Sequence, residues 1–380
     1  MPIFMDRHDV SEAVTAEDIA LLHQADLKIQ SHFGCRALTY WFDENRKTAF
    51  CLIEAPDRNC IHKMHNKAHG QVPNSIIAVD AGIVESFLGR IEDPEKSQNT
   101  ALNIINDPAF RTIMIIRLNR FPFKQNQVHL PAPLLKNHRN AILKLLPSFD
   151  GNLVKQSETD FLISFKSVSN AVHAASQIRS LFTKTNKLSK YKFGLKIALN
   201  AGVPVTEKKL IFESTIQLAE RMCSALRGEI ILASQVRDLY NGENPKSLSE
   251  NEAVYCLTQK DEDFLNSLVD YMDANGDNTD LSVNDLSKAT GYSKPQLYRK
   301  MILLTGKSPN AFINEYRLNK ALQMLKRNEK NISEIAFQTG FNSPSYFSKR
   351  FQERYGHLPS THLLKQKQQL KNLHSSTDLS

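Results

Sequence analysis

The chain has 380 residues, of which 41% are hydrophobic and 23% charged. This composition is that of an ordinary globular protein, and the length predicts two or three domains. No apolar run approaches the ~20 residues that a membrane span requires, and no basic segment precedes an apolar one at Met1–Asp6. We therefore expect neither a membrane protein nor a signal peptide. The five scattered cysteines favour reduced thiols in a cytoplasm over a disulfide framework.

The net charge of +8 is concentrated near the C-terminus. Residues 281–371 contain 16 Lys+Arg and 5 Asp+Glu, a local charge of +11, whereas the remainder carries −3. One basic block on a slightly acidic body is typical of a protein that binds a polyanion. A solvated basic surface is the alternative, and charge alone does not decide between the two.

The first 80 residues predict two helices and four strands in the order β-α-β-β-α-β. This order is that of an α+β, ferredoxin-like domain, which we place at residues 1–84, and its first and third strands are central neighbours. The predicted strands are residues 2–8, 36–42, 48–53 and 76–79, and the predicted helices are 15–33 and 57–69.

Metal-type ligands gather in this domain. His65 and His69 are four residues apart on one face of the predicted second helix, and this spacing can hold one metal ion. His8 and Cys51 lie on the two predicted central strands, so we expect them to be close together. Imidazole and thiolate suit Ni, Zn or Cu better than Mg or Ca. The alternative is ordinary: two surface histidines and a small core cysteine.

Three motifs in this domain carry a family resemblance. Met5-Asp-Arg-His8, Cys51-Leu-Ile-Glu-Ala-Pro56 and His65-x-x-x-His69-Gly70 resemble a small bacterial nickel-binding family with a ferredoxin-like fold. The similarity covers residues 1–90. It implies that Ni or another transition metal binds here, and His8, Cys51, His65 and His69 are the candidate ligands.

The middle of the chain predicts a polar linker and then a second, α/β domain. The linker, residues 85–110, contains two Asp-Pro pairs. The domain, residues 111–257, predicts both helices and strands. Its predicted strands are 112–118, 192–199 and 229–232 with a hairpin at 149–165, and its predicted helices are 169–182 and 215–225.

This domain is similar to the class III nucleotide cyclases. The resemblance rests on Lys155-x-x-x-x-Asp160-Phe161, on residues 195–202, on Leu218-Ala-Glu-Arg221-Met-Cys223 and on residues 228–234. Such enzymes use two carboxylates to hold two metal ions on the triphosphate, and these ions activate the attacking hydroxyl.

The residues at the matching positions argue against catalysis. Arg117 stands at the first carboxylate position and Thr159 at the second, although Asp160 is a neighbouring substitute. Gln217 replaces the family's transition-state Asn, whereas its Arg is retained as Arg221. We expect no enzyme activity, because a cation cannot ligate a metal ion. A nucleotide-sensing role and a dimerising spacer both remain open.

The basic C-terminal block contains an internal repeat. Leu286-Ser-Lys-Ala-Thr-Gly-Tyr292 returns 49 residues later as Ile335-Ala-Phe-Gln-Thr-Gly-Phe341. Each copy predicts a short helix, a turn at Gly291 or Gly340, and a second helix that starts at a capping Ser293 or Ser343. Residues 308–325 predict a long amphipathic helix between the copies, which would hold the two second helices about one duplex turn, ~34 Å, apart.

The repeat resembles the DNA-binding domain of the AraC/XylS family of bacterial transcription activators. The strongest match is Ile335-Ala-Phe-Gln-Thr-Gly-Phe-Asn-Ser-Pro-Ser-Tyr-Phe-Ser-Lys-Arg-Phe351 with Tyr355-Gly356 and Pro359. We place this all-α domain with two helix-turn-helix motifs at residues 262–366, followed by a flexible tail at 367–380. The resemblance implies sequence-specific binding of double-stranded promoter DNA, with RNA polymerase as a partner.

Side chains of the two second helices are the candidate DNA contacts. Arg299 suits guanine, Gln296 suits adenine and Tyr346 suits a thymine methyl. Pro295 departs from the family pattern because it cannot donate a hydrogen bond. The positions implied to face bases are Pro295, Gln296, Tyr298, Arg299, Ser345, Tyr346, Ser348 and Lys349; those expected at phosphates or at the helix start are Lys294, Lys300, Ser343 and Arg350.

The sequence thus predicts a cytoplasmic, multidomain transcription regulator. A ligand, either a metal or a nucleotide, would act on the first two domains, and a homodimer is expected because both resemble families that dimerise. An active cyclase with an attached DNA-binding domain is the alternative, and a metal-storage protein is a third reading that the basic block does not fit.

Overall fold

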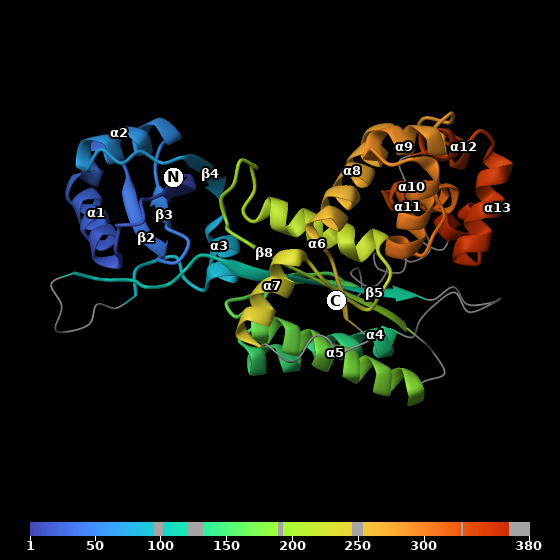
Figure 1. Ribbon diagram of the computed structural model, residues 1–380, viewed down its shortest axis with the longest axis horizontal. Helices are drawn as coiled ribbons and strands as arrows, with labels where there is room; N and C mark the ends of the chain where they lie inside the picture. Colours follow the sequence, from blue (N-terminus) through green and yellow to red (C-terminus); the bar gives the residue numbers. More distant parts are fainter. Residues whose placement is uncertain (95–101, 121–131, 189–192, 245–253, 328–329, 365–380) are drawn as a thin grey trace, which may run out of the picture.

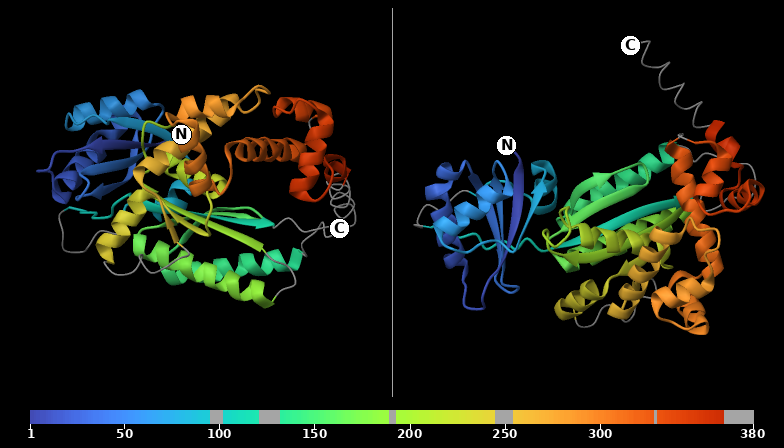
Figure 2. Two further views of the ribbon diagram at one scale, coloured as in Figure 1. Left: turned by 45° about the vertical axis from the view of Figure 1, so that its right-hand side comes forward. Right: turned by 90° about the horizontal axis from the view of Figure 1, so that it is seen from above.

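The computed structural model describes residues 1–94, 102–120, 132–188, 193–244, 254–327 and 330–364. Figures 1 and 2 show that the first domain and the C-terminal helices lie at opposite ends of a central sheet. Across the described residues, no helix is both long and apolar enough to cross a lipid bilayer.

The N-terminal part has the predicted order β-α-β-β-α-β. Its sheet is antiparallel with strand order β2-β3-β1-β4, so the first and third strands are the central pair, as expected. Side chains Thr15 and Asp57 cap the two long helices. The elements are β1 (Ile3–Asp9), α1 (Ala16–Ile29), the 3-10 helix η1 (Gln30–Phe33), β2 (Arg36–Asp43), β3 (Thr48–Glu54), α2 (Arg58–Ala68) and β4 (Ser75–Val79).

The central part is a six-stranded mixed sheet with strand order β10-β9-β8-β5-β7-β6. The predicted strands, hairpin and two helices are present, whereas α3, α4, α7 and the edge strand β10 were not predicted. The elements are α3 (Ala81–Leu88), β5 (Arg111–Arg120), α4 (Ala132–Leu145), η2 (Leu146–Phe149), β6 (Asn152–Gln156), β7 (Asp160–Phe165), α5 (Val168–Leu188), β8 (Phe193–Gly202), α6 (Glu213–Ala225), β9 (Ile230–Leu232), α7 (Ser234–Glu243) and β10 (Val254–Cys256).

The expected linker is structured at its described residues. Helix α3 crosses the boundary expected at residue 84, and Ile105 and Ala109 are buried. Arg111 is 1% exposed, and its guanidinium donates to the carbonyl oxygens of Phe87 (3.0 Å), Leu88 (3.1 Å), Pro108 (2.6 Å) and Phe110 (2.9 Å). The sequence reading missed this because Asp-Pro pairs mark turns and do not reveal what the neighbouring apolar residues contact.

The C-terminal part contains the two predicted helix pairs and the long helix between them. Gly291 and Gly340 have positive φ angles of 72° and 83°, as the sharp turns require. Capping boxes at Ser282–Asp285 and Asn331–Glu334 start the first helix of each pair. The elements are α8 (Gln259–Asn275), α9 (Val283–Thr290), α10 (Lys294–Thr305), α11 (Pro309–Arg327), α12 (Ile332–Gln338) and α13 (Pro344–Tyr355).

Two of the hydrophobic cores are shared between parts. One core joins Trp41 and Phe50 of the first sheet to Phe87 and Phe212 of the central part. A second continues from the central sheet through α8 into the first helix pair, where it contains Leu297 and Met301. The second helix pair has a core of its own, which includes Phe341, Phe347 and Phe351.

Candidate metal centre and nucleic-acid interface

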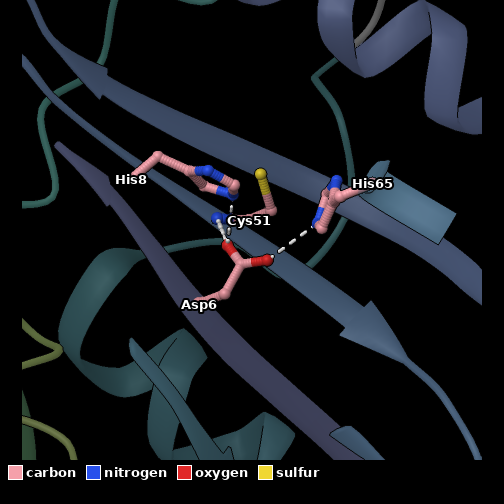
Figure 3. A group of neighbouring side chains, drawn as sticks. All are labelled: Asp6, His8, Cys51 and His65. Carbon is pink, nitrogen blue, oxygen red and sulfur yellow. Dashed lines mark hydrogen bonds and ion pairs between the residues drawn. The ribbon is translucent and has the colours of Figure 1, made fainter. Parts of the chain in front are cut away.

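A cluster of buried polar side chains lies between the first sheet and its helices. Because strand residues alternate between faces, Asp6 and His8 of β1 both point toward α1 and α2, where Cys51 of β3 meets them. His65 of α2 completes the group (Figure 3). One ligand atom of each of the four residues lies within 4.8 Å of all the others. The structure therefore brings the predicted His8, Cys51 and His65 together.

His65 lies between two carboxylates. Its Nε2 is 2.9 Å from Asp6 Oδ2 and its Nδ1 is 3.1 Å from Asp26 Oδ1. Burial alone would lower the pKa of His65, but the hydrogen bonds to Asp26 and Asp6 outweigh burial and raise the pKa to about 10. For Asp6, burial would raise the pKa, yet His8 and His65 hold it well below its usual range.

His69 lies on the far side of the His65 ring. Its Nε2 is 3.2 Å from His65 Nδ1 and 3.3 Å from Asp26 Oδ1. Asp26, His65 and His69 form a second group of ligand-type atoms within 4.8 Å of one another. His69 thus joins the predicted site through His65 and Asp26.

The donor set fits a transition metal. Two imidazoles, a thiol and a carboxylate meet around one point, and these are the ligand types of Ni, Zn and Cu sites. The buried His8 Nε2 makes no hydrogen bond within the described residues and is 3.5 Å from Asp6 Oδ1. Burial, together with the charges of Asp6 and Asp26, raises the pKa of the Cys51 thiol well above its usual value. A cation would reverse that effect, because a bound metal stabilises the thiolate.

Asp6 and Asp26 were missed as members of the cluster. For Asp6 a signal existed, since it is two residues from His8 on a strand and so shares its face. For Asp26 no local pattern points to α2, because only the packing of α1 on α2 brings it to His65.

Most predicted DNA contacts lie on the surface of α10 and α13. Tyr298 and Tyr346 are 51% and 49% exposed, although both are large and aromatic. Side chains Leu297, Met301, Phe347 and Phe351 are fully buried beneath them. The exposed members of the predicted set are Lys294, Pro295, Gln296, Tyr298, Arg299, Ser345, Tyr346 and Lys349, and the half-buried ones are Lys300, Ser343, Ser348 and Arg350.

Besides the helix-capping Ser343, three of these side chains have hydrogen-bond or ion-pair partners within the protein. Lys300 Nζ, which was expected to contact a phosphate, forms an ion pair with Asp261 of α8. Arg350 Nη1 is 2.6 Å from Glu353 Oε2. Gln296 Oε1 accepts from the backbone N–H of Ser293 (3.0 Å), which leaves only its amide nitrogen for a base.

Three of the positions that we matched to the cyclases line a cavity of about 520 Å³ between the central part and the C-terminal helices. Arg117 Nε is 2.8 Å from Asp160 Oδ1, so the neighbouring carboxylate is already paired. Arg221 Nη1 donates to Asn266 Oδ1 of α8 (2.7 Å). Arg117, Gln217 and Arg221 share this cavity with residues of α11, among them Tyr316.

Two family models match the chain. The model described as "Helix-turn-helix domain" matches residues 286–364, and "Nickel responsive protein SCO4226-like" matches residues 4–79. Neither covers the middle domain.

Among curated relatives, the uncharacterized HTH-type transcriptional regulator YdeC of Bacillus subtilis is 33% identical over 79 residues, 21% of this chain and 27% of its own. HTH-type transcriptional regulator MtrA of Neisseria gonorrhoeae is 34% identical over 74 residues, 20% of this chain and 25% of its own. Histidine kinase P4 of Formosa agariphila is 36% identical over 135 residues, 36% of this chain and 10% of its own. The chain thus spans between a tenth and about a quarter of the length of these relatives.

Solved structures also match each end of the chain. An AraC-type transcriptional regulator from Chromobacterium violaceum is 30% identical, with 27% of this chain and 91% of that one covered and a TM-score of 0.26. SCO4226 from Streptomyces coelicolor is 28% identical, with 20% and 94% covered and a TM-score of 0.20. Residues 286–364 are therefore similar to a helix-turn-helix domain, and residues 4–79 are similar to the SCO4226-like nickel responsive family.

Proposed function

We propose that this protein is a metal-responsive transcription regulator that binds promoter DNA sequence-specifically through α10 and α13. The observation that carries the proposal is the pair of exposed polar faces on these helices, each supported by buried apolar residues, within the segment similar to a helix-turn-helix domain. Helix α11 connects the two pairs, so one rigid element sets the distance between two reading helices. The Arg299 guanidinium and the amide nitrogen of Gln296 are the base-reading candidates on α10.

The proposed effector is a divalent transition metal held in the N-terminal cluster. His8, Cys51 and His65 would hold it together with Asp6, with His69 beside them. The metal would supply a strong positive charge that fixes β1, β3 and α2 relative to one another. Similarity to a nickel responsive family supports nickel as the first ion to test.

The shared cores give such an effector a physical route to the DNA-binding helices. The sheet that carries the cluster packs its opposite face against Phe87 and Phe212. The central sheet in turn shares its core with Leu297 and Met301 of α10. A change in how the first sheet packs would therefore alter the position of α10.

The central domain, in this proposal, connects the other two without catalysing a reaction. Arg117 occupies the position of a metal-binding carboxylate and neutralises Asp160. A homodimer in the cytoplasm that contacts RNA polymerase completes the proposed mode of action. Formation of cyclic nucleotide from ATP or GTP by the purified chain would contradict this part.

The test maps DNA sites bound by the full chain with and without added nickel. We expect a defined sequence motif whose occupancy depends on nickel in the wild type, and no such dependence in Cys51→Ser. His62→Ala is the matched control, because His62 lies on the exposed side of α2. Binding that is sensitive to salt but blind to sequence would contradict the regulator proposal.

A further inference from the structure

The His65 ring separates two groups of ligand-type atoms. Its Nε2 faces Asp6, with His8 and Cys51 beside it, and its Nδ1 faces Asp26 and His69. An unprotonated imidazole nitrogen has one lone pair in the ring plane, and the lone pairs of the two nitrogens point in different directions. A single ion therefore cannot use both nitrogens of His65.

We propose that the cluster is a two-metal centre in which the deprotonated His65 ring bridges two divalent transition-metal ions. Asp6, His8, Cys51 and His65 Nε2 hold the first ion, and Asp26, His69 and His65 Nδ1 hold the second. The inference rests on the proposed metal-binding function and extends it to a second ion.

The separations between donor atoms suit this arrangement. Bonds of about 2.0–2.3 Å in tetrahedral geometry place neighbouring ligand atoms about 3.3–3.7 Å apart. In the second group, His69 Nε2 is 3.2 Å from His65 Nδ1 and 3.3 Å from Asp26 Oδ1. In the first group, His8 Nε2 is 3.5 Å from Asp6 Oδ1. Small outward movements of these side chains admit an ion on each side of the ring.

Charge balance favours two ions over one. In the metal-free cluster, His65 bonded to both carboxylates carries two ring protons, and the ion pairs of Asp6 and Asp26 among the described residues are with histidines. Two bound divalent ions balance two carboxylates, the Cys51 thiolate and the His65 imidazolate. With one ion in the first group, the Asp26 charge would stay buried without a cation, which is costly.

Binding releases protons in a fixed number. His65 loses two ring protons and Cys51 loses its thiol proton, so three protons leave for two ions bound. The ring proton of His69 moves from Nε2 to Nδ1. The exposed backbone N–H of Gln71, which now donates to Nδ1 over 3.1 Å, would then bond to water.

The number of ions held by the full chain tests the proposal. The chain is loaded with Zn²⁺ and its bound ions are counted by native mass spectrometry, while Co²⁺ loading reports the first group through its thiolate charge-transfer band. We expect two ions in the wild type and in the control His62→Ala. His69→Ala is expected to hold one ion and keep the cobalt band, and Cys51→Ser is expected to lose the band.

The alternatives give different results. One ion in the wild type, with number and band unchanged in His69→Ala, would overturn the second site and leave Asp26 and His69 as hydrogen-bond partners of His65. Two ions retained in a folded His65→Gln variant would overturn the bridge. If no ion binds the wild type at all, the metal-binding function itself fails. Should His65→Gln not fold by circular dichroism, the count in His69→Ala still decides about the second ion.

Discussion

Arg299 is an exposed cation on the α10 face that we assign to base reading. Its fork of N–H donors matches guanine O6 and N7, and loss of such a pair costs about 1–3 kcal/mol of discrimination. Arg299→Ala should therefore remove the base preference at one base pair of the DNA site and leave the preferences at the other positions unchanged. Binding to a library of sites by the purified variant measures this.

Lys294→Ala is the control for that experiment. Lys294 is an exposed cation at the start of the same helix, and we expect it to contact a phosphate. Its loss should weaken binding to all DNA sequences alike and lower the slope of log affinity against log salt concentration by about 1. A uniform loss in Arg299→Ala would place Arg299 at a phosphate too.

Lys300 forms an ion pair with Asp261 within the protein. Burial alone would raise the pKa of Asp261, but hydrogen bonds from Lys300 and Thr258 outweigh it and hold the pKa below 3.8. The stabilising pair is thus complete above pH 3.8 and is lost as the pH falls through the lowered pKa.

Lys300→Met should lower the free energy of unfolding by about 1 kcal/mol at neutral pH. The difference from wild type should shrink below pH 3.8, as urea unfolding across a pH series will measure. Lys294→Met serves as control, and equal DNA affinity of Lys300→Met and wild type is expected. A loss of DNA affinity in Lys300→Met without a loss of stability would instead support a contact between Lys300 and a DNA phosphate.

Some residues of the candidate site could be predicted from the sequence and others could not. His65 and His69 follow from helical spacing, and Cys51 and His8 follow from the predicted strand order. Asp26 could not be predicted, because its role depends on how one helix packs on another. The inward turn of Lys300 was equally hidden, since its partner Asp261 lies on a helix outside the repeat.

At the scale of elements, the turn glycines Gly291 and Gly340 differ in how closely other atoms pack around them. Both have positive φ, but a Cβ on Gly340 would lie 2.7 Å from the Gly276 carbonyl oxygen and from Arg317 Nε, whereas none of the described residues comes within 4 Å of a Cβ on Gly291. Arg317 of α11 itself donates to Gly276 O over 2.9 Å. The turn of the second helix pair thus sits directly on the loop after α8.

Gly291→Ala should cost about 1–2 kcal/mol, the price of a left-handed alanine. Gly340→Ala should cost about 1–3 kcal/mol more, because the added methyl displaces packed backbone. Thermal unfolding of both variants measures the difference. Equal losses of stability in the two variants would mean that the loop between α8 and α9 moves to make room for the methyl group added at Gly340.

Elements with a periodic pattern or a capping signature were predicted within a few residues. Helices α9, α10, α12 and α13 begin at such signatures, and the predicted strands lie at apolar runs. The helices α3, α4 and α7 were not predicted, because the pattern of their polar and apolar residues can be assigned to a buried face only once the sheet that they cover is known.

At the scale of the whole molecule, we expect the helix pair whose core is separate from the central sheet to unfold locally before the pair that shares the core of that sheet. The first helix pair shares its core with the central sheet, whereas the second pair depends on its own small core. Amides in α12 and α13 should therefore exchange with deuterium through local opening at lower free energy than those in α10. Hydrogen exchange of the full chain measures this; equal protection in α10 and α13 would mean that both pairs open as one unit.

The segment after α3 has one more consequence. Phe42 N–H of β2 donates to the Asp107 carbonyl oxygen over 3.2 Å, and the Ile105 N–H bonds to the Tyr40 hydroxyl over 2.9 Å. These two bonds tie the segment to β2, the outermost strand on that side of the first sheet. An uncovered edge would offer a row of free donors and acceptors to another molecule. Strand-to-strand joining of two N-terminal sheets through β2 would have to displace this segment, so we expect the proposed homodimer to use a different surface.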